Sequence, residues 1–186
     1  MRASECDLLI LPGLGGGSPD HWYMRWAARL STARRVEQRD FDAPRLEEWT
    51  QAIARAAGAA ERPVVLVGHA LGALAGVHAA ARLDTVVAAF LVAPPSETAL
   101  RAAAGVDPAF AHAPRAPLGF PALLVASRND SWCDYEDAAA YAAAWGATLA
   151  DAGLSGHIDP ESGHGPWPEG LMRFGQFLAR IDKKIA

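Results

Sequence analysis

The sequence predicts an α/β fold built on a mainly parallel sheet of about five or six strands, with helices on both faces. Apolar runs of strand length alternate with segments of helix length along the chain. Two of these runs, Pro63–Val67 and Thr85–Ala93, are apolar almost throughout, as expected for strands buried on both faces. A chain of 186 residues suits a single domain, which we expect to span residues 1–186.

In the first half of the chain, breaking residues separate the expected elements. Pro12 and Gly13 end a first strand, and the run SPD at 18–20 is the start signal of the next helix. Pro44 leads into an amphipathic helix. The expected elements are the strand Asp7–Leu11, the helix His21–Leu30, a short strand at Arg35–Gln38, the helix Arg45–Gly58, the strand Pro63–Val67 and the Ala- and Gly-rich helix Leu71–Arg82.

The second half follows the same alternation. Pro94 and Pro95 stop the strand Thr85–Ala93, and Asp134 can cap a later helix. Residues 96–119 form a loop-rich stretch with several prolines, which we expect to influence specificity; the sequence leaves open whether this stretch forms a small cap over the site. The remaining elements are the strand Pro121–Ala126, the helix Tyr135–Trp145, a weaker strand at Ala147–Asp151 and the helix Glu169–Arg180.

Composition excludes several classes of function. The formal net charge is −4 and the basic residues are scattered, so no nucleic-acid partner is expected. No apolar run reaches the roughly 18 residues that cross a membrane, and the N-terminus lacks the long apolar core of a signal peptide. Cys6 and Cys133 are expected to be free thiols in a reducing compartment, which predicts a cytoplasmic protein.

Residues 64–74, VVLVGHALGAL, place a strand, a tight turn and a small-residue helix in succession. This is the setting of the nucleophile elbow, G-x-S-x-G, whose strained turn presents a serine hydroxyl beside a backbone N–H that can stabilise an oxyanion. Here the nucleophile position is Ala70, between Gly68 and Gly72. Taken alone, the pattern also fits an ordinary strand-to-helix turn.

Two later strand ends offer an acid and a base. Asp130, in the run SRND, follows the strand Pro121–Ala126 and can orient a histidine, although it could equally cap a turn. His157, beyond the strand Ala147–Asp151, is our first choice of general base, and His164 is the second. The order of elbow, acid and histidine along the chain is that of α/β-hydrolases.

The Gly-rich run LPGLGGGSPDHW, residues 11–22, follows the first strand. Its backbone can supply one oxyanion donor, with Leu14 the first choice and Gly15 the next, while Leu71 after the elbow supplies the other. A flexible turn is the plainer interpretation. The run has neither the phosphate-loop pattern nor the dinucleotide spacing G-x-G-x-x-G, so no nucleotide cofactor is expected.

No metal is expected either. His21, His69, His157 and His164 could converge with Asp130, but no H-E-x-x-H motif or cysteine cluster has ligand spacing. We therefore expect a site that works without any cofactor.

The wall of the expected pocket is predicted to include aromatic groups close to the site. The candidates for substrate binding are Gly15 and the aromatic residues His21, Trp22, Trp132 and Trp167, although tryptophans also suit core packing. Cys133 lies near the acid but not on an elbow, so we interpret it as a pocket-wall or buried thiol.

With these residues in hand, the sequence resembles the small α/β-hydrolases of retinoblastoma-binding protein 9 and its bacterial YdeN-like relatives. The resemblance covers nearly the whole chain, in the stretches LPGLGGGSPDHW, VEQRDFDAPRLEEWTQAI, VVLVGHALGALA, VASRNDSWCDYEDAAAYAAAWGA and GHIDPESGHGPWPEG. It implies a compact serine hydrolase with a minimal lid or none. It also implies a Ser–Asp–His triad with Asp130 as acid, His157 as base and Ala70 where the family has serine.

We therefore expect a serine hydrolase with carboxylesterase-like activity on small esters, thioesters or amides. Because acid, base, glycines and oxyanion loop all surround Ala70, we expect an engineered Ser→Ala substitution in an active enzyme. The chain as written should then be essentially inactive. The alternative is a natural pseudoenzyme that binds a ligand or a partner protein at the empty elbow.

Overall fold

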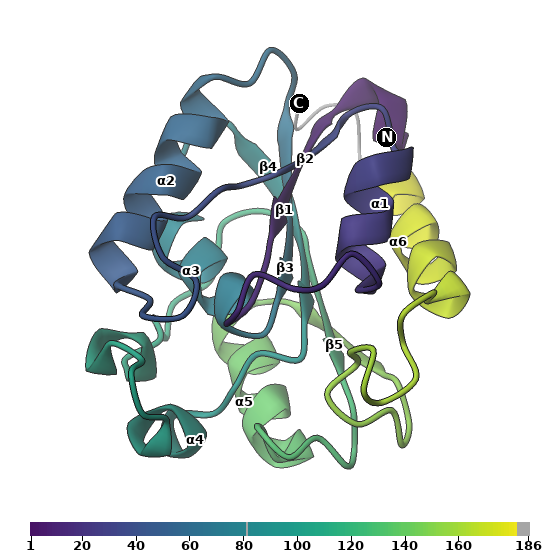
Figure 1. The fold of residues 1–186 in the computed structure, drawn as a ribbon. Helices are drawn as coiled ribbons and strands as arrows, with labels where there is room; N and C mark the ends of the chain where they lie inside the picture. The colour runs from purple at the N-terminus through teal and green to yellow at the C-terminus, as the bar shows by residue number, and fades with distance from the viewer. Residues whose placement is uncertain (81, 182–186) are drawn as a thin grey trace.

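A computed structural model describes residues 1–80 and 82–181 of the chain. Its described part contains a six-stranded sheet in the order β2-β1-β3-β4-β5-β6, with every neighbouring pair parallel (Figure 1). The strands are Asp7–Leu11 (β1), Ala33–Arg35 (β2), Val64–His69 (β3), Val86–Val92 (β4), Ala122–Ala126 (β5) and Thr148–Asp151 (β6). The predicted α/β fold with a parallel sheet of five or six strands is confirmed.

Helices cover both faces of this sheet (Figure 1). The α-helices are Trp22–Arg29 (α1), Leu46–Gly58 (α2), Leu71–Ala80 (α3), Glu97–Ala102 (α4), Tyr135–Trp145 (α5) and Pro168–Arg180 (α6), and two 3₁₀ turns are Ala3–Glu5 (η1) and Pro108–Ala111 (η2). The predicted helix Leu71–Arg82 is described as far as Ala80, and residue 81 lies outside the described residues.

Side-chain alternation along the strands builds two apolar cores, one on each face. In β1, Leu8 and Ile10 pack with the aromatic side chains of α1 and α6, whereas Leu9 and Leu11 pack with α2 and α3. Helix α3 is buried nearly all round, which explains its run of Ala and Gly. The central strands are buried on both sides, as their continuous apolar sequence predicts.

Apart from small shifts at the ends of elements, two regions differ from the sequence-based expectation. The strand expected at Arg35–Gln38 lies instead at Ala33–Arg35, because the register pairs Leu8 of β1 with Ala33. The loop-rich residues 96–119 contain α4 and η2, which were not predicted. Ser96 begins α4 as its N-cap, with its Oγ accepting a hydrogen bond from the Ala99 N–H at 3.2 Å.

Parallel strands bring their carboxyl ends to one edge of the sheet, where ligands bind in folds of this kind. The segments that follow β1, β3, β5 and β6 therefore meet at this edge, and they carry the candidate site residues. In the part of the chain that the structure describes, no helix is long and apolar enough to cross a membrane.

Candidate active site

The elbow turn between β3 and α3 holds Ala70 in a strained conformation. Its φ is +49°, in the left-handed region that residues with a Cβ rarely adopt, at a cost on the order of 1–3 kcal/mol. The Ala70 N–H donates to the Val92 carbonyl at 2.9 Å, which ties the turn to β4. Such a turn aims the side chain of its central residue away from the sheet and toward the cleft.

The two glycines of the elbow allow backbone segments to approach closely. A Cβ at Gly68 would lie 2.6 Å from the Ala73 Cα, and a Cβ at Gly72 would overlap the Leu11 carbonyl oxygen. Both positions therefore exclude any side chain. This packing lets α3 start directly over the end of β1, so the first free N–H groups of the helix face the cleft edge.

Asp130, after β5, and His157, after β6, form a close pair. The Nδ1 of His157 lies 2.9 Å and 3.0 Å from the two carboxylate oxygens of Asp130. The Asp130 side chain is only 2% exposed and also accepts the Trp132 N–H at 2.9 Å. Because a carboxylate only accepts, Nδ1 of a neutral His157 carries the proton and Nε2 is left as the basic nitrogen.

A second set of hydrogen bonds joins the loop that carries His157 to the turn that carries Asp130. The Ser127 Oγ accepts the Ser155 N–H at 2.9 Å and contacts the Asn129 Oδ1 at 2.9 Å. The Asn129 Oδ1 also accepts the Gly156 N–H at 2.8 Å. Ser127 is almost fully buried, whereas the bond between Asn129 and the Gly156 N–H is exposed, and together these bonds set the spacing between acid and base.

His69, the residue before Ala70, also forms a hydrogen bond with the loop that carries His157, residues 152–166, which we call the base loop. Its Nε2 lies 2.9 Å from the carbonyl oxygen of His157, so Nε2 carries the proton and donates it to that carbonyl. Burial, with the neighbouring His157 and His21, holds the pKa of His69 well below its usual value, and the ring is neutral. Sequence reasoning treated His69 only as a possible metal ligand and missed this contact, although its place inside the elbow was a signal.

Two backbone N–H groups remain available beside Ala70. Among the described residues, neither the Leu71 N–H nor the Leu14 N–H has a hydrogen-bond partner, and both residues line the cleft. The second choice, Gly15, differs, because its N–H donates to the Phe41 carbonyl at 2.9 Å and it does not line the cleft. Leu14 and Leu71 are thus the donors that suit an oxyanion.

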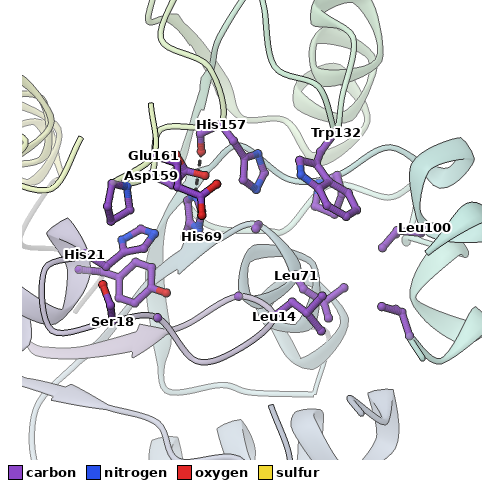
Figure 2. A pocket seen from close by; sticks show the side chains of 17 residues that line it. Leu14, Ser18, His21, His69, Leu71, Leu100, Trp132, His157, Asp159 and Glu161 are labelled. Carbon is purple, nitrogen blue, oxygen red and sulfur yellow. Dashed lines mark hydrogen bonds between the residues drawn. The ribbon is translucent and has the colours of Figure 1, made fainter. Parts of the chain in front are cut away.

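These groups border a cleft of about 370 Å³ (Figure 2). Its lining comes from the loops after β1, β3, β4, β5 and β6 and from the segment that contains α4. The lining residues are Gly13, Leu14, Gly17, Ser18, His21, Tyr23, His69, Ala70, Leu71, Pro95, Leu100, Val106, Trp132, His157, Asp159, Pro160 and Glu161. Leu100 and Val106 lie in residues 96–119, so this segment forms part of one wall.

Of the four aromatic residues expected at the pocket wall, the structure brings two to the cleft. His21 and Trp132 line it, and the Trp132 ring lies 6.0 Å from that of His157. Trp22 and Trp167 do not, which corrects the expectation. They pack together in the core beside α1, 5.1 Å apart, and the Trp22 Nε1–H donates to a buried carbonyl.

Two other residues considered from the sequence do not line the cleft. His164 does not line the cleft, and its backbone and ring contacts are to Asp159 and Ser162. Cys133 is buried, and burial raises the pKa of its thiol to about 12, which makes it a poor nucleophile. Neither it nor Cys6 forms a disulfide.

His21 is held as a neutral ring at the edge of the site. Burial lowers its pKa to about 3, and its ring stacks on that of Tyr23 at 3.7 Å. Within the described ranges, no group of three His, Cys, Asp or Glu side chains is arranged to hold a metal ion. The polar lining residues Ser18, Tyr23, Asp159 and Glu161 were not identified from the sequence, because no motif marks them.

A parallel sheet with a strained elbow turn and an Asp–His pair beyond later strands is the arrangement of α/β-hydrolases. The sequence model of the family described as serine hydrolase matches residues 8–176, and the chain belongs to this family. A YdeN-like hydrolase of Pectobacterium atrosepticum is 32% identical, with 94% of this chain and 91% of that chain covered and a TM-score of 0.83.

Two more distant structures share the fold. The ydeN gene product of B. subtilis is 19% identical, with 94% of this chain and 99% of that chain covered and a TM-score of 0.76. Est1E of Butyrivibrio proteoclasticus, solved with ferulic acid bound, is 16% identical, with 95% and 90% covered and a TM-score of 0.74. No curated protein sequence matches this chain.

Proposed function

We propose that this protein is a carboxylesterase-like serine hydrolase that acts through a Ser–Asp–His triad, present here with Ala70 in the nucleophile position. The observation that carries the proposal is the contact of both Asp130 carboxylate oxygens with Nδ1 of His157, beside the cleft that Ala70 lines. The substrates are small esters first, then thioesters and amides, because the cleft is modest in volume and open to solvent.

With serine at position 70, the reaction runs in two steps. Nε2 of His157 removes the hydroxyl proton as Oγ attacks the carbonyl carbon, and the N–H groups of Leu71 and Leu14 stabilise the oxyanion. His157 then returns the proton to the leaving alcohol, and an acyl-serine remains. Water attacks this ester with His157 again as base, which releases the acid and restores the serine. Asp130 keeps the imidazole in the required tautomer throughout.

The elbow itself supports the view that Ala70 replaces a serine. Ala70 has a strained φ of +49° and lies between two crowded glycines, Gly68 and Gly72, although its methyl group cannot react. Strain of this kind persists at functional positions, where the geometry serves the chemistry. We infer that the alanine is an engineered substitution, and that the chain as written is essentially inactive.

The missing hydroxyl also favours a second candidate, a natural pseudoenzyme that binds a small molecule or a partner protein. In that case the cleft beside Ala70 would hold its ligand without turnover. The natural gene distinguishes the two candidates directly, since a serine codon at position 70 supports the enzyme and an alanine codon supports the binding protein.

We also propose that the protein works in the cytoplasm. Cys6 and Cys133 are both buried and unpaired, as is usual for proteins of reducing compartments. Fractionation of the source cells tests this, and recovery of the protein with secreted material would contradict it.

The experiment that tests the function writes serine back into the elbow. Ala70→Ser should gain labelling by a fluorophosphonate probe and hydrolysis of a short-chain p-nitrophenyl ester, with a rate on the order of 10⁶ times that of the Ala70 protein. That factor follows the loss seen when a protease loses its nucleophile. Both readouts are measured on the two proteins side by side.

The matched control adds His157→Ala to the Ala70→Ser protein, which should abolish labelling and turnover. Asp130→Asn in the same background should lower the rate by about 10⁴, because the imidazole then adopts the wrong tautomer. If Ala70→Ser stays inert to probe and ester while its unfolding is normal, the proposed triad is wrong and the binding protein becomes the better candidate.

A further inference from the structure

The cleft is polar at one end and apolar at the other, with His157 between the two (Figure 2). Figure 2 shows Ser18, His21, Asp159 and Glu161 on one side of the reacting groups. Leu14, Leu71, Leu100 and Trp132 lie on the other side. A substrate that fills this cleft therefore has one polar and one apolar part.

The polar end carries negative charge. Asp159 and Glu161 contribute carboxylates, and the described residues that line the cleft include no lysine or arginine. Hydrogen bonds from the backbone N–H and Oγ of Ser162 hold one oxygen of Asp159, each at 2.8 Å. Burial raises the pKa of Asp159, but these bonds together with the neighbouring His157 and His21 lower it by more, so the group is ionised at neutral pH.

Carboxylate oxygens without a hydrogen-bond partner lie at this end of the cleft. Within the described part of the chain, the second carboxylate oxygen of Asp159 has no partner, and neither carboxylate oxygen of Glu161 has one. The Arg35 guanidinium, whose charge lowers the pKa of Tyr23, is ion-paired with Glu37 at 3.2 Å and lies outside the cleft lining. No described cation neutralises the two carboxylates.

His21 is a second, independent sign of a ligand here. It is only 5% exposed and lines the same end of the cleft, yet neither ring nitrogen has a hydrogen-bond partner among the described residues. A buried imidazole without partners is costly, and a neutral one offers an acceptor nitrogen. With the proton on the buried Nδ1, Nε2 is the acceptor nitrogen, and a group rich in N–H donors would bond to Nε2 and to the Asp159 carboxylate together.

We propose that this end of the cleft is a subsite for an ammonium group, so that preferred substrates carry an amine on one side of the scissile bond and an apolar group on the other. The part of this inference that concerns the scissile bond rests on the proposed function, whereas the binding of the amine does not depend on it. Anionic groups are excluded from this end, because they would meet two carboxylates at short range.

The Ala70 protein tests the subsite without any turnover. Hexylammonium, 1-hexanol and hexanoate share one alkyl chain and differ only in the charge of the head group. Each compound is titrated into the protein and its affinity is measured from NMR chemical shifts. Hexylammonium should bind about fivefold more tightly than 1-hexanol, the size of effect expected for a partly exposed ion pair. Hexanoate should bind weakest, and the preference should shrink in 0.5 M salt.

Variants locate the effect within the cleft. Asp159→Asn keeps the oxygen that accepts from Ser162 but loses the charge, so it should remove most of the preference for the ammonium. His21→Phe keeps the stack on Tyr23 and should weaken hexylammonium and 1-hexanol alike. Glu136→Gln on α5 removes one charge outside the cleft and should leave all three affinities unchanged.

The subsite and the proposed function fail in distinguishable ways. Equal affinities for hexylammonium and 1-hexanol, or a preference that survives Asp159→Asn, would overturn the subsite even if Ala70→Ser hydrolyses esters. A clear ammonium preference in a protein whose Ala70→Ser form is inert would support the subsite and refute the hydrolase. In an active Ala70→Ser form, p-nitrophenyl 6-aminohexanoate should be hydrolysed with a kcat/KM about fivefold above that of the hexanoate ester.

Discussion

The elbow and the base loop border the same cleft but are held in place by different forces. The elbow, residues 68–72, is held by backbone packing so close that Gly68 and Gly72 admit no side chain. The base loop, residues 152–166, is held by polar side chains, chiefly Ser127 and Asn129. The elbow should therefore be sensitive to added volume, and the base loop to lost hydrogen bonds.

The largest effect is expected from adding one methyl group to the elbow. Gly72→Ala would drive its Cβ into the backbone of the loop after β1, which cannot yield as a flexible side chain can. We expect a loss of about 3 kcal/mol or more in the free energy of unfolding, measured by urea denaturation. Gly175→Ala, in α6 with no atom within 4 Å, is the control and should stabilise by up to about 1 kcal/mol. Similar losses in both variants would contradict the packing argument.

The next effect concerns His69, which connects the two regions through the His157 carbonyl. In the Ala70→Ser protein, His69→Phe should lower kcat by up to about 10², because the base loses its anchor to the elbow, while KM changes little. His69→Gln keeps an N–H donor and should recover most of the loss. Steady-state kinetics with a p-nitrophenyl ester measures both. Equal activity of the Phe variant and its parent would show that the base loop holds His157 without His69.

Acid should lower the stability of the fold first through two buried histidines, His69 in the elbow and His21 before α1. Burial keeps His69 and His21 neutral in the folded protein, whereas in the unfolded chain each takes up a proton below about pH 6.5. The contribution of these neutral histidines to the free energy of unfolding is therefore fully present above that pH. It falls as the pH drops, by about 2 kcal/mol per histidine from pH 7 to pH 5.

Replacing one of these histidines tests the assignment. His21→Phe should remove about 2 kcal/mol of the difference in unfolding free energy between pH 7 and pH 5, while His69 and His78, whose pKa values burial also lowers, keep their contributions. The carboxylates of Asp151 and Asp159, whose pKa values are lowered by hydrogen bonds, should lose their contribution only below about pH 4. A His21→Phe protein as acid-sensitive as its parent would contradict the neutral buried ring.

The smallest effect is expected from one hydroxyl beneath the base loop. Ser127→Ala leaves the Ser155 N–H without its partner and should cost about 1 kcal/mol of stability. In the Ala70→Ser background it should also lower kcat, since the spacing of acid and base loosens. Ser31→Ala, at an exposed turn, is the control and should change neither quantity. An unchanged Ser127→Ala protein would mean that backbone packing holds this loop as well.

Predictions from the sequence were most accurate at positions where the residue type permits few local backbone structures. The apolar runs, prolines and glycines marked the strands, and the strand ends marked Ala70, Asp130 and His157 as candidates. The predictions were wrong for Trp22 and Trp167, because a tryptophan near a motif can face either the cleft or the core, and only packing decides. They placed the edge strand β2 too late, since its register depends on β1.

By itself, the sequence determined the alternation of strands and helices, the elbow glycines and the order of the candidate residues, because these depend on local periodicity and backbone sterics. Only the tertiary structure decided that His69 reaches His157, that Gly15 bonds to Phe41, and that Asp159 and His21 share one end of the cleft. The residues brought together in this way lie up to 138 positions apart in the sequence. The distances between these residues follow from the order of the strands in the sheet and the course of the loops between them, which no local sequence pattern encodes.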